Sequence, residues 1–158
     1  MPDKNQLSGT VSLGEYGLKR ADVSLSLPFG KWKQSISGGF SEGDGYRYNT
    51  DFKQQNILYQ SQLSLVQGTW RVLAGFNNKA FGANGFYGFT SYIDQYEETQ
   101  ASLIGLSTVI KSGNFTWKPR IYWRRNQDLY LLVRNTPLTY RNLHITNKVA
   151  VELNGSYQ

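Results

Sequence analysis

Residues 57–76 read ILYQSQLSLVQGTWRVLAGF, and this stretch decides the fold class. In its first half apolar and polar side chains alternate, and one parity holds Ile57, Tyr59, Leu63 and Leu65. After Gln67-Gly68 the alternation resumes at Trp70, Val72, Ala74 and Phe76. A period of two is typical of a strand with one apolar and one polar face, and a glycine-containing break between two strands is typical of a hairpin.

The same alternation extends outward over nearly the whole chain. It covers eight stretches, at residues 7–14, 20–29, 32–40, 57–65, 70–76, 104–110, 115–124 and 143–153. The sixth stretch is less regular, because Leu103 and Val109 lie on the other parity. No stretch has a helical period. The sequence therefore predicts an all-β chain, with one domain over residues 1–158 and eight antiparallel up-and-down strands.

The connections between the predicted strands alternate between short and long. Those after the second, fourth and sixth strands are tight and contain glycine, at residues 28–31, 67–68 and 112–114. Those after the third, fifth and seventh strands cover about 41–56, 77–98 and 125–141. Short turns at one end and long loops at the other are typical of outer-membrane barrels. With an even number of strands, both termini lie at the short-turn end, which is periplasmic in that class.

Composition excludes several classes of site and partner. The chain has no cysteine and one histidine, His144, so a disulfide framework, a thiolate site and a His-pair zinc site are excluded. No apolar run approaches the roughly 18 residues of a transmembrane helix. The net charge is +6, but the basic residues are scattered, which favours a basic surface or cavity lining over nucleic-acid binding. The polar start, Met1-Pro2-Asp3-Lys4, has no signal core, so we expect a cytosolic chain or a removed export signal.

Tryptophan placement separates a membrane sheet from a soluble one. Trp32, Trp70 and Trp117 each follow a tight turn on the apolar parity. Trp123 and Phe76 lie six positions further along their strands, and Phe40 lies eight positions beyond Trp32. A tilted strand rises roughly 2.5 Å per residue along a barrel axis, so these aromatics bracket a band of about 15–20 Å. That approaches the apolar band of an outer-membrane barrel. We therefore assign Trp32, Trp70, Trp117 and Trp123 to membrane girdles, with a soluble sandwich as the alternative.

Four segments are more specific than the alternation: residues 45–52 (GYRYNTDF), 74–87 (AGFNNKAFGANGFY), 94–99 (DQYEET) and 118–128 (KPRIYWRRNQD). They resemble the barrel of a TonB-dependent outer-membrane receptor, most closely the cobalamin-receptor-like branch of Bacteroides-type bacteria. The resemblance implies an outer-membrane location and a parent role in energised uptake of a large nutrient such as a corrinoid. The chain corresponds to about the first third of a barrel of about 22 strands, without plug or coupling box. We therefore expect no active transport by this chain alone.

Two architectures are compatible with eight such strands: a fragment or subunit of a large barrel, or a small closed barrel, natural or engineered. The polar face carries an excess of cations, Lys33, Arg71, Lys118, Arg120, Arg124 and Lys148 against Asp22 and Glu152, which suits a wide, watery lumen. An open sheet in lipid, however, leaves two unsatisfied edges. We expect a closed eight-stranded transmembrane barrel, with several copies in one wider barrel as a further alternative.

Candidate site residues lie at the long-loop end. The ligand-contact candidates are aromatic: Tyr46, Tyr48, Phe81, Phe86, Tyr87 and Tyr92; the alternative for each is a membrane-interface belt. The calcium candidates are Asp94, Glu97 and Glu98, with Asp44 and Asp51 as further carboxylates; solvated loop carboxylates are the alternative. No cofactor is expected. An enzyme is not expected either, because His144, with Asp128 and serines as candidate partners, is more typical of a hydrogen-bonded lining residue.

The sequence thus predicts an outer-membrane β-barrel wall whose partners are outer-membrane lipid or detergent and further copies of the chain, and not nucleic acid. The rival from another class is a soluble lipocalin-type barrel that binds a small ligand. That rival needs an apolar interior and a polar exterior. The charged face is too polar for such a cavity, and the apolar face carries tryptophan at strand ends, as lipid contact requires.

Overall fold

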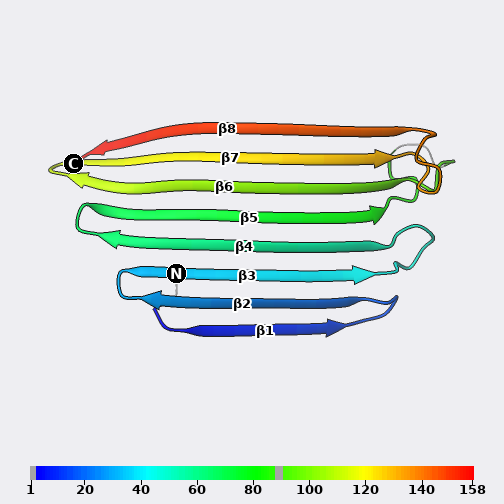
Figure 1. Ribbon diagram of the computed structural model, residues 1–158, viewed down its shortest axis with the longest axis horizontal. Coiled ribbons are helices and arrows are strands. Elements are labelled where there is room, and N and C mark those ends of the chain that lie inside the picture. Colours follow the sequence, from blue (N-terminus) through cyan, green and yellow to red (C-terminus); the bar gives the residue numbers. More distant parts are fainter. Residues whose placement is uncertain (1–2, 88–90) are drawn as a thin grey trace.

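The computed structural model describes residues 3–87 and 91–158, so the chain start at 1–2 and the loop tip at 88–90 lie outside the description. Eight antiparallel strands follow one another in sequence order in a single sheet (Figure 1), which confirms the predicted all-β, up-and-down fold. They are β1 (Gln6–Leu13), β2 (Lys19–Phe29), β3 (Trp32–Gly43), β4 (Phe52–Leu65), β5 (Gly68–Gly82), β6 (Tyr96–Ser112), β7 (Phe115–Leu131) and β8 (Arg141–Tyr157). Within this described part, no helix has the length and hydropathy needed to span a membrane.

The strand register collects the alternating apolar residues on one face. Residues directly opposite each other on neighbouring strands share a face. Val72 on β5 lies opposite Leu106 on β6, which lies opposite Ile121 on β7, and Ile121 lies opposite Val151 on β8. We call this side the apolar face; it also carries Leu7, Val11, Val23, Leu25, Trp32, Ile36, Ile57, Leu63, Trp70, Phe76, Ile104, Trp117, Trp123, Ile145 and Val149.

On β4 to β7 the apolar face is interrupted near the loop side by a row of amides, beyond which Leu129 and Leu143 lie opposite each other on β7 and β8. Gln55, Asn78, Gln100 and Gln127 lie opposite one another across β4 to β7. The strands continue past this row, so the loops are shorter than predicted and cover residues 44–51, 83–95 and 132–140. The predicted boundaries were wrong because the backbone ladder needs no apolar side chains. Alternation marks only the length of strand that has an apolar face.

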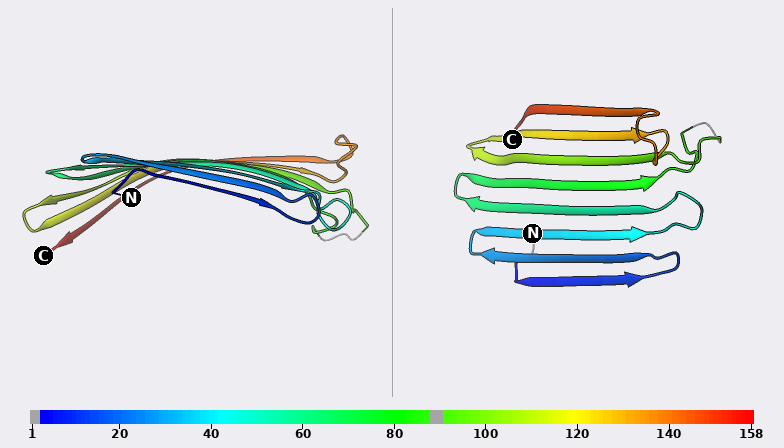
Figure 2. Two further views of the ribbon diagram at one scale, coloured as in Figure 1. Left: turned by 90° about the horizontal axis from the view of Figure 1, so that it is seen from below. Right: turned by 45° about the vertical axis from the view of Figure 1, so that its right-hand side comes forward.

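The sheet is a single layer (Figure 2). Almost none of its described residues is buried. Among the described residues, the buried apolar side chains are Ala83 and Leu131. The accessible surface is 10907 Å². A compact folded monomer of this mass exposes roughly 8,000 Å². Within residues 3–87 and 91–158, the fold therefore leaves the apolar face without a protein layer over it.

The expected closed barrel was wrong. Within the described residues, β1 and β8 are the two edge strands of an open sheet, and they do not pair with each other. β1 has 8 residues and β8 has 17, so a ladder between them would leave about half of β8 without a partner. Closure would also enclose the cations of the polar face in an interior just wide enough for side chains.

The opposite, polar face carries those cations at its surface. Arg120 pairs with Glu152, Arg20 pairs with Asp22 at 2.6 Å, and Lys33 pairs with Asp3. A hollow of about 740 Å³ lies on this face between Ser35 on β3 and Glu152 on β8. A hollow that reaches across six strands of one layer means that the sheet curves around its polar face.

Candidate functional site

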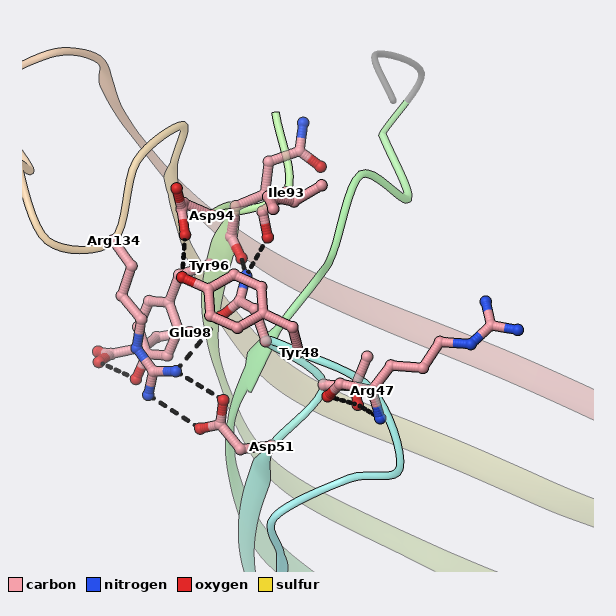
Figure 3. Close-up of polar contacts among 11 residues, drawn as sticks. Arg47, Tyr48, Asp51, Ile93, Asp94, Tyr96, Glu98 and Arg134 are labelled. Atoms are coloured by element: carbon pink, nitrogen blue, oxygen red, sulfur yellow. Dashed lines mark hydrogen bonds and ion pairs between the residues drawn. The ribbon is translucent and has the colours of Figure 1, made fainter. Parts of the chain in front are cut away.

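The three long loops are tied together at one end of the sheet, opposite the three tight turns (Figures 1 and 3). Arg134, in the 132–140 loop, binds Asp51, in the 44–51 loop, through two parallel hydrogen bonds of 2.6 and 2.9 Å. Its backbone nitrogen donates to the carbonyl of Asp94, in the 83–95 loop. Tyr48 donates its hydroxyl to the Asp94 carboxylate. We call these residues, together with Asn49, the loop latch.

Arg134 is the centre of the loop latch. Its guanidinium lies 4.4 Å from the ring centroid of Tyr96, the first residue of β6. The hydrogen bonds to Asp51, followed by the charge of that carboxylate, raise the pKa of Arg134 above its ordinary value. A planar guanidinium that binds both oxygens of a carboxylate defines distance and orientation together, which a lysine does not. The pair therefore sets how two loops meet.

Asn49 completes the loop latch through its side-chain amide. Its nitrogen donates to the carbonyls of Ile93 at 2.8 Å and Gln95 at 2.7 Å. Asn49 has φ of 52°, a left-handed conformation that asparagine tolerates better than most residues. Gly82 lies against it, and a Cβ at Gly82 would stand 2.5 Å from the Asn49 carbonyl oxygen. A side chain at position 82 would therefore displace the 44–51 loop.

The six aromatic candidates do not form one cluster. Tyr48 belongs to the loop latch, and Phe81 lies on the polar face of β5 beneath the Lys79 ammonium, 4.4 Å from its ring. Tyr46 packs edge-on against Tyr16, with ring centroids 6.3 Å apart. The remaining three lie in the 83–95 loop: Phe86 and Tyr87, whose rings are 5.2 Å apart and perpendicular, and the exposed Tyr92.

The calcium candidates also lie apart. Glu97 and Glu98 are consecutive residues of β6, so they point to opposite faces of the sheet. Glu97 accepts the Tyr87 hydroxyl, Glu98 accepts the Tyr96 hydroxyl at 2.9 Å, and Asp94 accepts the Tyr48 hydroxyl. Among residues 3–87 and 91–158, no three His, Cys, Asp or Glu side chains are grouped to hold a metal ion.

The four tryptophans lie where the alternation predicts, on the apolar face. Trp32 and Trp70 both lie opposite Leu63 of β4, one strand on either side. Trp117 follows the β6–β7 turn, and Trp123 lies six residues further along β7, opposite Ile104. Six residues of strand span about 20 Å. The Trp32 indole nitrogen donates to the Ser61 hydroxyl at 2.8 Å on the same face.

Tyr87 gives a spectroscopic test of the loop end. Burial, followed by the hydrogen bond to Glu97, raises the pKa of Tyr87 above its ordinary value of 10.0. Because the folded pKa is the higher one, this contribution to stability is complete below pH 10 and is lost as pH rises through the folded value. We expect the difference in 295 nm absorbance between wild type and Tyr87→Phe to rise well above pH 10. In urea, where the chain is unfolded, the same absorbance difference should rise near pH 10. Equal midpoints for the folded and the unfolded protein would contradict the contact between Tyr87 and Glu97.

Sequence reasoning missed Arg134, Asn49 and Gly82. Arg134 and Asp51 are 83 residues apart, and no local pattern connects them. The signal that was available is weaker: asparagine and glycine in loops next to strand ends are typical of special backbone conformations.

Comparison with known proteins returns no match: no protein-family model, no curated protein and no solved structure is significantly similar to the chain.

Proposed function

We propose that this chain forms part of the wall of a transmembrane β-barrel in a bacterial outer membrane. The apolar face contacts acyl chains, and the polar face borders a watery lumen. The observation that carries the proposal is the uncovered apolar face, where for example Ile104 is 55% exposed and Val151 is 73% exposed. Soluble monomers rarely expose apolar patches of more than a few hundred Å². Lipid is the solvent in which such a face is stable.

The curvature of the sheet supports lipid over a soluble barrel. The hollow lies on the polar face, which makes the polar side concave and the apolar side convex. A lipocalin-type module needs the reverse, with its apolar side chains inside. On β4 to β6 the row from Gln55 to Gln100 separates the apolar band from the loops, as the interface of a bilayer requires.

The two open edges support a wall that further strands complete. Each edge strand has backbone N–H and C=O groups without a partner strand, and hydrocarbon does not tolerate them. The cations around the hollow, such as Arg71 and Arg120, suit a lumen wide enough for water. We therefore favour a barrel with more than eight strands, in which copies of this chain or strands of another polypeptide pair with β1 and β8.

The four resembling segments extend the proposal to a parent function. Two of them, residues 45–52 and 94–99, contain the loop-latch residues Tyr48, Asn49, Asp51 and Asp94. We propose that the wall belongs to a TonB-dependent receptor for a large nutrient such as a corrinoid. In that role the aromatic loop residues contact the ligand, and coupled uptake needs parts beyond this sheet.

Tryptophan fluorescence tests the lipid contact directly. The chain is refolded from urea into phosphatidylcholine vesicles brominated either near the carbonyl end or near the methyl end of the acyl chains. Since all four tryptophans lie on the apolar face, we expect both lipids to quench the emission. Bromine near the carbonyl end should quench more, because Trp32, Trp70 and Trp117 occupy a girdle.

The control is aqueous iodide, which reaches only side chains in water. Weak iodide quenching together with strong bromine quenching supports the proposal. A β-rich monomer in plain buffer whose tryptophans are quenched by iodide and not by brominated lipid would refute it.

A further inference from the structure

A second hollow, of about 460 Å³, lies on the polar face at the loop end, over β6, β7 and β8. Tyr87 and Gln95, from the 83–95 loop, and Leu132 and Tyr140, from the 132–140 loop, lie on its outer side. We call it the tyrosine–carboxylate pocket; it is lined by Tyr87, Gln95, Glu97, Asp128, Tyr130, Leu132, Tyr140, Asn142 and His144. The loop latch holds both loops in place beside it, so the pocket has defined walls.

The pocket is acidic in a basic protein. Glu97 and Asp128 both line it, and within the described residues neither forms an ion pair with a lysine or arginine. The Tyr87 hydroxyl donates to Oε2 of Glu97, so Oε1 of the same carboxylate can interact with a ligand. On the polar face, Lys79 is two strands away from Asp128, and its ammonium lies over Phe81. The basic side chain in this lining is His144, which lies opposite Asp128 on β8. Two carboxylates beside one imidazole favour a cation.

Three tyrosine rings form the wall beside these carboxylates. The Tyr87 and Tyr130 ring centroids are 5.5 Å apart at 81°, and those of Tyr130 and Tyr140 are 6.2 Å apart at 69°. Perpendicular rings in a row present faces in more than one direction. Aromatic faces next to carboxylates are the side chains that bind substituted ammonium groups.

Gln95 supplies an independent sign of a ligand. Its side chain lines the pocket and is 1% exposed. Its oxygen accepts the backbone N–H of Tyr87 at 3.3 Å, and among the described residues its buried amide nitrogen has no hydrogen bond of good geometry, although the side chain interacts with the Tyr130 hydroxyl. An unpaired buried donor is costly, and an oxygen acceptor brought by a ligand would satisfy it after a small shift.

We propose that the tyrosine–carboxylate pocket binds a small organic cation, a substituted ammonium group that carries a hydroxyl oxygen. The ammonium lies between the tyrosine faces and the carboxylates of Glu97 and Asp128, and the hydroxyl accepts from Gln95. The site opens on the polar face, so it takes the free molecule and not a lipid headgroup. It does not depend on what covers the apolar face.

Choline is the probe, and its neutral isostere 3,3-dimethylbutan-1-ol is the matched control ligand. Both are titrated by calorimetry into the whole chain folded in maltoside micelles, which carry no ammonium group. We expect choline to bind and the isostere to bind at least about threefold more weakly. Asp128→Asn should weaken choline by about three- to tenfold, whereas Asp44→Asn, outside the pocket, should leave it unchanged.

Two substitutions of Tyr130 distinguish the contribution of its aromatic ring from that of its hydroxyl. Tyr130→Phe keeps the aromatic face and should retain binding, whereas Tyr130→Leu should weaken it by about threefold or more. Equal affinity for choline and its isostere, unchanged binding in Asp128→Asn, or no binding by wild type with β-rich circular dichroism overturns the proposal. Failure of the lipid-quenching experiment is a separate result, because the calorimetry needs only the folded sheet.

Discussion

Val72→Arg is expected to lower the free energy of unfolding in lipid vesicles by about 2–4 kcal/mol, the cost of a cation at the middle of a lipid-facing strand. Val72 lies at the centre of the apolar face, between Trp70 and Ala74 on β5 and opposite Leu106 on β6. Urea titration of tryptophan emission in vesicles measures the change.

Leu73→Arg is the matched control for this substitution. Leu73 is the next residue on the same strand, but it faces the 740 Å³ hollow, where a guanidinium reaches water. We expect its loss to be about 1 kcal/mol or less. Equal losses at both positions would show that the two faces are not solvated differently and would contradict the lipid contact.

Two pairs of introduced cysteines are expected to give opposite results, one within the sheet and one between its two edge strands. The chain has no cysteine, so a pair of introduced cysteines has no competitor. In Ser8→Cys with Ser24→Cys, the two positions lie opposite each other on β1 and β2, and we expect an intramolecular disulfide after oxidation in detergent. In Ser8→Cys with Thr146→Cys, on β1 and β8, we expect none, because these strands are opposite edges of the sheet.

Non-reducing gels distinguish the ways in which the edges are completed. A ladder of dimers and larger species from the Ser8 and Thr146 pair supports assembly of several copies into one wider barrel. Unlinked monomers from that pair, beside a cross-linked control, favour strands from another polypeptide. A cross-linked monomer would instead restore the small closed barrel.

Local pattern predicted the part of the fold that depends on neighbouring residues. The strand that holds Trp70, Val72 and Phe76 was identified from parity alone, and the register places all three on the apolar face. The β6 segment with Leu103 and Val109 was less regular for a physical reason. Leu103 belongs to the hollow on the polar face, so both parities carry apolar residues there.

The candidate site was predicted less well, because its residues meet across long sequence separations. Tyr48 and Tyr87 were named for their aromatic character, but their partners Asp94 and Glu97 were named as calcium candidates. In the structure each carboxylate accepts a tyrosine hydroxyl instead. Parity already separates Glu97 from Glu98, and it is the signal that was available against a shared ion.

The sequence by itself determined the strand number, the two faces and the face on which the tryptophans lie. These follow from the two-residue period of an extended backbone, which sends alternate side chains to opposite sides whatever lies elsewhere in the chain. Only the tertiary structure decided that the sheet stays open, that Arg134 joins Asp51, and that three tyrosines meet two carboxylates over β6 to β8. Each of these depends on how distant strands and loops meet, and the sheet brings such residues together through its register, which no single stretch of sequence contains.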